Sequence, residues 1–181
     1  MSFLALDPPR HTRMRALVSR GFTPRRVLDL APRITALTHE YLDPALERGE
    51  FDLIGDVAGK LPMDVISELI GVPPADRAEV RRLADLLVHR EQGVFDVPPT
   101  GIEAAIALHA YYADMVAQRL AAPTDDLTSA LVQAEIDGER LTTDEVIAFL
   151  FLLVVAGNET TTKLLGNALY WAWRNPGTAE R

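Results

Sequence analysis

The sequence predicts an all-α protein, with at most one small β-hairpin, in a single domain over residues 1–181. Proline and glycine divide the chain into segments, and nearly all of these segments repeat their apolar residues every three or four positions, as an amphipathic helix does. The alternation of apolar and polar residues that predicts strands is almost missing. A composition of 48% hydrophobic and 24% charged residues is that of a globular protein with a sizeable core.

Two helices are predicted in the first part of the chain. The first spans residues 8–21, because prolines suit a first helical turn and a glycine often follows a last one. The second begins at a Thr-Pro pair and covers residues 23–49, where the apolar residues keep helical spacing. We expect Pro32 and Pro44 to kink or break this second helix.

The middle of the chain also shows helical spacing. Residues 51–70 form a mostly apolar segment, and residues 75–90 form a charged amphipathic helix. A loop at 94–101 separates this helix from another over residues 102–120. A short helix is predicted at residues 127–133.

The last helix is the longest one that the sequence predicts. It follows an Asp-Gly turn that indicates the small hairpin. Thr142 and Glu145 fit a capping box, and no strong breaker occurs before Asn175-Pro176, which gives roughly 32 residues or about 48 Å. Residues 149–155 are all large and apolar, so the middle of this helix must be buried. We expect the preceding residues to be too few to enclose it.

The charge of the chain excludes some classes of partner. A net charge of −8 argues against a nucleic-acid-binding protein, which normally carries a basic surface. Residues 1–33 nevertheless contain seven arginines and two aspartates, a local charge of +5. This basic segment predicts contact with an anion or an acidic partner, or else a solvated arginine-rich surface.

Neither a signal peptide nor a membrane span is predicted. The chain does not start with a basic region followed by an apolar region of useful length. The longest apolar run, residues 146–157, has 12 residues, whereas a bilayer requires ~20. We therefore expect a soluble cytoplasmic protein. It contains no cysteine, so its own residues cannot form a disulfide or a thiolate metal site.

A polar cluster, residues 157–162, interrupts the apolar part of the last helix. Glycine costs about 1 kcal/mol relative to alanine inside a helix, and a buried carboxylate is costly unless it is hydrogen-bonded. One explanation is that the helix emerges into water here and its hydroxyls bond back to carbonyls one turn earlier. The other is a ligand site beside a distorted helix, where Gly157 admits the ligand, Thr160 directs its hydroxyl into the gap and Glu159 is a proton source.

Two motifs resemble those of a known family. Residues 156–161, Ala-Gly-Asn-Glu-Thr-Thr, resemble the signature of the long central helix of the cytochromes P450. Residues 7–15 are similar to that family's early helix with its His-x-x-x-Arg pair, and the Gly-Phe-Thr-Pro turn at 21–24 follows it as in the family. The resemblance covers essentially the whole chain. It implies the central portion of the cytochrome P450 fold, with a long buried helix.

The resemblance implies a haem cofactor and an electron donor. His11 and Arg15 would donate hydrogen bonds to a haem propionate, and their i, i+4 spacing places them on one helix face. Without the family, two exposed charges on a basic helix would be the simpler interpretation. The remaining arginines of the basic segment would bind an acidic, ferredoxin-type electron-transfer protein.

The resemblance also assigns roles on the central helix. Ala156 and Gly157 would lie against the haem face where oxygen binds. Thr160 would hydrogen-bond the bound oxygen, and Glu159 would help to relay protons. These residues would serve the oxygen-dependent hydroxylation of a small organic or lipid-like substrate.

Leu152 and Val155, about one turn before that signature, are candidates for the substrate pocket wall. Plain core packing is an equally good interpretation of both. The helices at 75–90 and 102–120 occupy the places of the family's substrate-covering helices.

The family's cysteine ligand and its Glu-x-x-Arg helix are missing from this sequence, which also lacks the family's early helices and strands. We therefore expect a partial cytochrome P450 domain without a metal ligand of its own, inactive alone. The alternatives are a non-enzymatic helical remnant that acts as an interaction module, or one half of a split enzyme completed by a separate, complementary chain.

Overall fold

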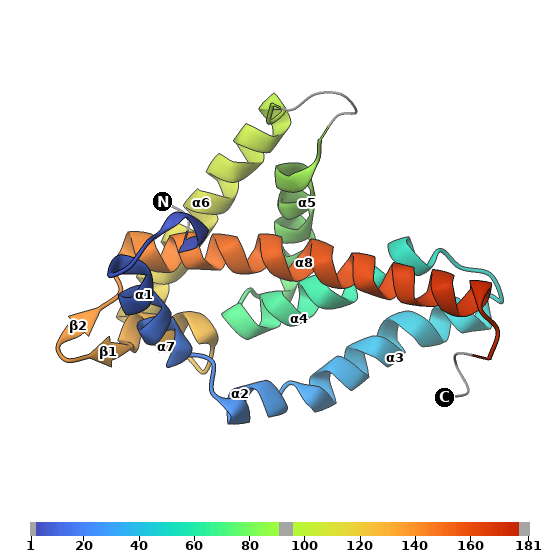
Figure 1. The fold of residues 1–181 in the computed structure, drawn as a ribbon, viewed down its shortest axis with the longest axis horizontal. Coiled ribbons are helices and arrows are strands. Elements are labelled where there is room, and N and C mark those ends of the chain that lie inside the picture. The colour runs from blue at the N-terminus through green and yellow to red at the C-terminus, as the bar shows by residue number, and fades with distance from the viewer. Residues whose placement is uncertain (1–2, 91–95, 178–181) are drawn as a thin grey trace.

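The computed structural model describes residues 3–90 and 96–177. Helices dominate it, and α8 runs along the long axis of the molecule with the other helices beside it (Figure 1). The predicted all-α class is confirmed. The α-helices are α1 (Arg10–Ser19), α2 (Pro24–Leu28), α3 (Ala31–Glu47), α4 (Leu61–Ile70), α5 (Arg77–Val88), α6 (Pro99–Ala121), α7 (Leu127–Gln133) and α8 (Thr143–Arg174).

Short elements connect these helices. They are the 3₁₀ turns Phe3–Ala5 and Pro74–Asp76, the π-helical segment Leu53–Ala58, and the strands β1 (Glu135–Ile136) and β2 (Glu139–Arg140). The two strands pair antiparallel, with Glu135 opposite Arg140. Asp137 and Gly138 form the turn with positive φ values of 53° and 81°, which the Asp-Gly pair tolerates. The predicted hairpin is confirmed.

Prolines act differently in the first and second half of the segment at 23–49. The Thr23 side chain accepts a hydrogen bond from the backbone of Arg26 and starts α2. This helix ends before Pro32, which lies in the first turn of α3, so the expected break occurs there. At Pro44 the helix does not break, because α3 continues to Glu47, which leaves only the kink of the two predicted outcomes. Only one turn follows Pro44, and its missing N–H removes a single hydrogen bond.

The segment predicted as one unit at 51–70 is divided in two. The π-helical turn begins at Asp52, whose side chain accepts a hydrogen bond from the backbone of Ile54. α4 follows and ends at Gly71, whose φ of 86° requires a residue that adopts the left-handed conformation. In the view of Figure 1, α4 lies below α8, and α5 and α6 project from the opposite side of α8.

The helices α5 and α6 lie within a few residues of their predicted bounds. α6 is longer at its start, because Pro99 takes the first helical turn and so shortens the predicted loop at 94–101. Residues 94 and 95 of that loop are outside the described residues.

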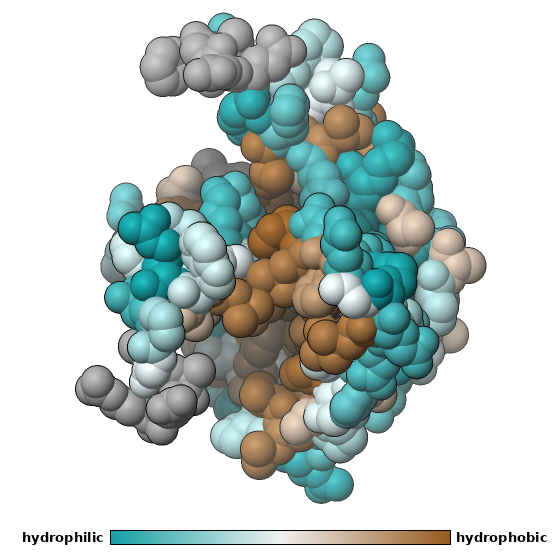
Figure 2. Space-filling model, turned by 90° about the vertical axis from the view of Figure 1, so that its right-hand side faces the viewer, coloured by the Kyte–Doolittle hydropathy of each residue, from teal (hydrophilic) through white to brown (hydrophobic). Residues whose placement is uncertain are grey.

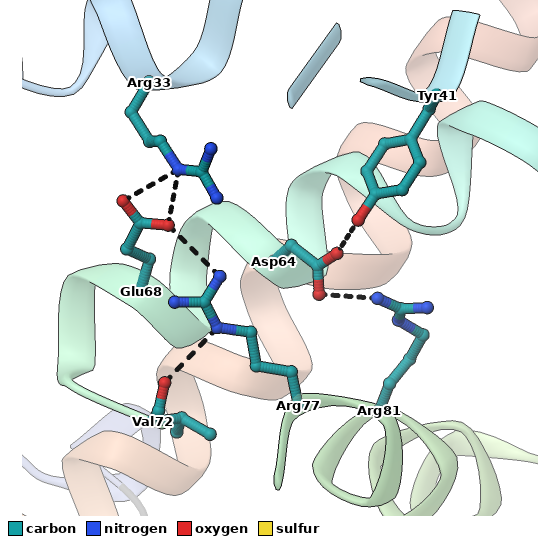
Figure 3. A network of polar contacts seen from close by, with 7 residues as sticks. All are labelled: Arg33, Tyr41, Asp64, Glu68, Val72, Arg77 and Arg81. Carbon is teal, nitrogen blue, oxygen red and sulfur yellow. Dashed lines mark hydrogen bonds and ion pairs between the residues drawn. The ribbon is translucent and has the colours of Figure 1, made fainter. Parts of the chain in front are cut away.

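A polar network joins α3, α4 and α5 (Figure 3). Glu68 of α4 accepts hydrogen bonds from Arg33 of α3 at 2.8 Å and from Arg77 of α5 at 3.2 Å. Asp64, which is buried, accepts from the Tyr41 hydroxyl and from Arg81 at 2.5 Å. Burial, together with the hydrogen bond to Asp64, raises the pKa of Tyr41 to about 12.

The last helix confirms both its predicted length and its predicted start. α8 has 32 residues, and Thr142 and Glu145 form the capping box with both reciprocal hydrogen bonds. Its first half is in the core, where Val146, Leu150 and Val154 are buried.

The burial predicted for residues 149–155 is only partly present, because Phe149, Leu150 and Val154 are buried and the other four residues are half-buried. From residue 155 to residue 174 none of the described side chains of α8 is buried. Leu164 is 67% exposed and Trp173 is 74% exposed. The other described segments therefore do not enclose the second half of α8, as expected from the sequence. Figure 2 looks onto the end of the molecule where α8 terminates and shows apolar side chains gathered in a central hollow with hydrophilic rims.

By length and composition, α8 could also cross a membrane, which the run of 12 apolar residues did not predict. Core helices of soluble proteins share this property. The first half of α8 packs among α4, α6 and α7.

Candidate functional site

The polar cluster of α8 lies where the helix leaves the core. The helix is continuous through residues 156–162, so the distortion expected beside a ligand does not occur. The Thr160 hydroxyl donates to the carbonyl oxygen of Ala156 at 2.6 Å and is thus satisfied one turn earlier. Thr160 and Ala156 are both exposed on one face of α8 and form a small, open surface there.

Glu159 lies at the surface beside cations. Its carboxylate pairs with Lys163 at 2.5 Å, and its side chain is 46% exposed. It lines a hollow of about 360 Å³ together with Lys60 and Arg81. This position gives the Glu159 carboxylate direct access to water, as a proton source requires.

Gly157 faces another helix. A Cβ atom at this position would lie 2.8 Å from Cγ1 of Ile66, so the absence of a side chain lets α8 and α4 approach closely. One turn further, the Thr162 hydroxyl donates to the carbonyl oxygen of Ala58 at 2.9 Å. Close packing of α8 against α4 is therefore sufficient to explain Gly157. The approach of a ligand is the explanation of this glycine that the sequence alone had offered.

The two predicted substrate contacts share an apolar hollow of about 570 Å³ beside the first half of α8. Leu152 and Val155 both line it. Its other apolar residues are Leu4, Ile147, Ala148 and Phe151. His109 of α6 and Asp144 of α8 are the polar residues that line it.

His11 and Arg15 lie one turn apart on α1, and His11 contacts an aromatic cluster. The His11 ring is 4.9 Å from the ring of Phe3, which in turn is 6.0 Å from the ring of Phe149 in α8. Arg15 is exposed. Within the part of the chain that the structure describes, neither His11 nor Arg15 has its side chain engaged in a hydrogen bond or an ion pair, so both are available to an anion.

Arg13 is a residue whose function the sequence did not reveal. It donates to Glu139, to the carbonyl oxygen of Arg140 at 2.5 Å and to Glu145 at 2.9 Å. It thus fastens α1 to the hairpin and to the start of α8. Burial acts to raise the pKa of Glu145, but hydrogen bonds from Thr142 and Arg13 outweigh it and hold that pKa below its ordinary value. No local signal predicts this, because the partners of Arg13 are more than a hundred residues away along the chain.

The residues present fit part of a haem site. The unpaired side chains of His11 and Arg15 can donate hydrogen bonds to the carboxylates of a porphyrin, and the open surface at Ala156 and Thr160 suits close approach of a flat ring. An iron ligand is not provided. The chain has no cysteine, and the described residues contain no cluster of His, Cys, Asp or Glu able to hold a metal ion.

Comparison with known proteins identifies close relatives. No protein-family model matches the chain. Over its full 181 residues it is 58% identical to cytochrome P450 123 of Mycobacterium tuberculosis, of which it covers 45%. Over 173 residues it is 43% identical to cytochrome P450 109 of Bacillus spizizenii, of which it covers 43%.

Solved structures agree with this result. All of the chain superposes on 49% of CYP109E1 from Bacillus megaterium, crystallised with corticosterone, with a TM-score of 0.92 and 32% identity. It also superposes on 44% of the mixed-function P450 MycG in complex with mycinamicin IV, with a TM-score of 0.88 and 36% identity. The chain therefore spans less than half the length of the relatives that it matches.

Proposed function

We propose that this chain, which is homologous to the cytochromes P450 over its whole length, is the substrate-side and oxygen-side part of a haem-dependent monooxygenase. The reaction would be hydroxylation of a small apolar organic substrate with O₂ and electrons from a redox partner. One observation carries this proposal. On α8, the exposed Ala156 and Thr160 adjoin the apolar hollow at Leu152 and Val155, so a reacting group and a substrate would have adjacent places.

The roles of the residues follow from their positions. His11 and Arg15 would bind the propionates of haem, and the Ala156 surface would lie against the ring. Bound haem supplies the activation of dioxygen, which protein side chains cannot perform. Thr160 would hold a proton at its hydroxyl toward that surface. Glu159, which is at the water boundary, would restore this proton from solvent.

The substrate would occupy the apolar hollow at Leu152 and Val155. A hollow of about 570 Å³ has the size of a site for a drug-sized molecule, and its lining is mostly apolar. The relatives crystallised with corticosterone and mycinamicin IV are similar to this chain, which supports an organic substrate that is mostly apolar.

An acidic electron-transfer protein of the ferredoxin type would bind the basic segment. Arg10 and Arg20 are exposed, and within the described residues their side chains form no ion pair. Positive charges that lack internal partners steer an acidic partner and set its orientation. Such a system would operate in the cytoplasm.

The 181 residues alone would be inactive, since they include no thiolate for the iron. We propose that a complementary polypeptide supplies it, as in a split enzyme. The exposed apolar residues in the second half of α8 favour this second chain over a free remnant, because an apolar surface of this kind normally marks an interface.

The test is a pair of haem reconstitutions. The chain alone, reduced under carbon monoxide, should lack the absorption band typical of thiolate-bound haem. The chain co-expressed with the remaining half of the Mycobacterium tuberculosis relative should show it. A thiolate-type band from the chain alone would contradict the proposed inactivity. Its absence from a stable complex of the two would contradict the split enzyme, and a helical protein that binds neither haem nor that half would favour the non-enzymatic module.

A further inference from the structure

The apolar hollow beside α8 has one end that is polar. Asp144 lies in the first turn of α8, and His109 of α6 lines the same hollow. Both are exposed side chains, whereas the remaining lining is aliphatic or aromatic. An apolar molecule in this hollow would therefore meet a carboxylate at one end only.

The Asp144 carboxylate has no internal partner. Within residues 3–90 and 96–177, it makes no hydrogen bond or ion pair, whereas its neighbour Glu145 is engaged by Arg13 and by the Thr142 backbone. This exposed negative charge attracts a cation with the modest strength of a surface ion pair, because water screens it. The hollow thus combines an apolar body with one negatively charged end.

The two ends are well separated along the helix. Val155 lies eleven positions after Asp144, which at 1.5 Å per residue is about 16 Å. A molecule whose apolar body reaches Leu152 and Val155 would place its other end near Asp144 only if it is elongated. This spacing excludes a compact ligand from using both ends.

We infer that the ligand of this hollow is an elongated amphipathic amine, with its apolar body along Ile147, Phe151 and Leu152 and its ammonium group at Asp144. This inference rests on the proposed function, because it names the substrate class of the proposed substrate site. The reacting carbon would then lie at the end opposite the amine.

The experiment compares three probes that differ only in their head group, namely decylammonium, decanol and decanoate. Each is titrated into the 181-residue chain below its aggregation concentration, and binding is followed from the methyl NMR signals of Ile147 and Leu152. We expect decylammonium to bind about two- to fivefold more tightly than decanoate, which is the range for one exposed ion pair. Decanol should fall between them.

Three variants test whether Asp144 and the apolar hollow cause the preference for decylammonium. Asp144→Asn should remove the preference for decylammonium, whereas Glu103→Gln, which removes an exposed carboxylate of α6 that does not line the hollow, should keep it. Ala148→Phe should weaken all three probes by filling the hollow. Circular dichroism verifies that each variant is folded. If Asp144→Asn does not fold, the inference is tested by the order of the three affinities in the wild-type chain and by the effect of Ala148→Phe.

Equal binding of the three probes, a preference for decanoate, or no binding would overturn the inference. The inference would also be overturned if the order of the three affinities were unchanged in the Asp144→Asn variant, or if the probes bound the Ala148→Phe variant as tightly as the wild type. These titrations require neither haem nor iron, so their failure leaves the test of the monooxygenase proposal intact. Failure of the haem reconstitution would likewise leave a measured preference for amines standing.

Discussion

Gly157 of α8 and Ile66 of α4 are in such close contact that a Cβ atom on the glycine would lie 2.8 Å from Cγ1 of the isoleucine. A side chain atom at that distance forces one of the helices to move. We expect Gly157→Ala to destabilise the protein by about 1 kcal/mol, because overpacking of ~1–3 kcal/mol outweighs the ~1 kcal/mol gain in helix propensity. Thermal and urea unfolding measure this change.

Gly166→Ala is the matched control. A Cβ there would meet only the end of the exposed Ile54 side chain, which can turn away. This variant should be neutral or slightly more stable. The cost of Gly157→Ala should also shrink in an Ile66→Ala background. Equal effects at the two glycines would show that packing against α4 is not the reason for Gly157.

Asp126 is the centre of a buried polar group where α6 meets α7. It accepts from Arg119 at 2.6 Å, from the Thr124 hydroxyl at 2.6 Å and from the backbone of Ser129 at 2.7 Å. Burial acts to raise the pKa of Asp126, but these hydrogen bonds outweigh it and leave the pKa lowered. We expect Asp126→Asn to cost about 1–3 kcal/mol at neutral pH.

The pH dependence of this cost has a definite sign. A lowered pKa in the folded state stabilises the protein above the unfolded-state pKa of about 3.9, and the stabilisation is lost as pH falls through the lower folded-state value. The stability difference between wild type and Asp126→Asn should therefore shrink below that pH. Asp125→Asn, at an exposed position, should change stability by less than about 0.5 kcal/mol. A gap that widens in acid would contradict the assignment.

Arg13 holds the hairpin and α8 against α1. We expect Arg13→Gln to cost up to about 1 kcal/mol, because it removes the hydrogen bonds from Arg13 to Glu145 and to the Arg140 carbonyl at a partly exposed site. It should also raise the pKa of Glu145, whose lowering depends in part on Arg13. NMR titration and hydrogen exchange in the hairpin measure both effects. Arg15→Gln, on the same helix, should leave stability and the hairpin unchanged.

Thr160 is expected to matter for reaction and not for folding. Its hydroxyl bonds only to the Ala156 carbonyl on an exposed helix face, so Thr160→Val should shift the free energy of unfolding by less than about 0.5 kcal/mol. In the complex reconstituted with the complementary half, substrate turnover should fall at least about tenfold through loss of the proton-holding hydroxyl. Thr161→Val is the control and should affect neither quantity. Equal turnover of the two variants would remove Thr160 from its proposed role.

The second half of α8 should make the chain associate. Leu164 and Trp171 are seven residues apart and both more than half exposed. Sedimentation should show oligomers that grow with protein concentration, and the double variant Leu164→Glu with Trp171→Glu should sediment as a monomer. The pair Thr161→Glu and Asn167→Glu, at two exposed uncharged positions, adds the same negative charge without removing apolar surface. A monomeric wild-type chain with cooperative unfolding would contradict the argument that α8 lacks cover.

Much of the fold follows from local signals. The capping box, the Thr-Pro start of α2 and the Asp-Gly turn each satisfy backbone groups within a few residues, so their effect depends little on the rest of the protein. Pro44 shows where such reasoning fails, because the cost of a proline depends on how much helix follows it. The distortion expected in α8 fails for a related reason, since the Thr160 hydroxyl finds its partner inside the helix.

The sequence by itself determined the all-α class, the length of α8 and the two motifs that resemble cytochromes P450, because helix caps and motif residues are read over short spans of chain. Only the tertiary structure decided what surrounds these residues. It placed Gly157 against Ile66, Glu159 at the water boundary and Asp144 at the open end of an apolar hollow. Burial and distance depend on segments far apart in the chain, and hence no local pattern of residues encodes them.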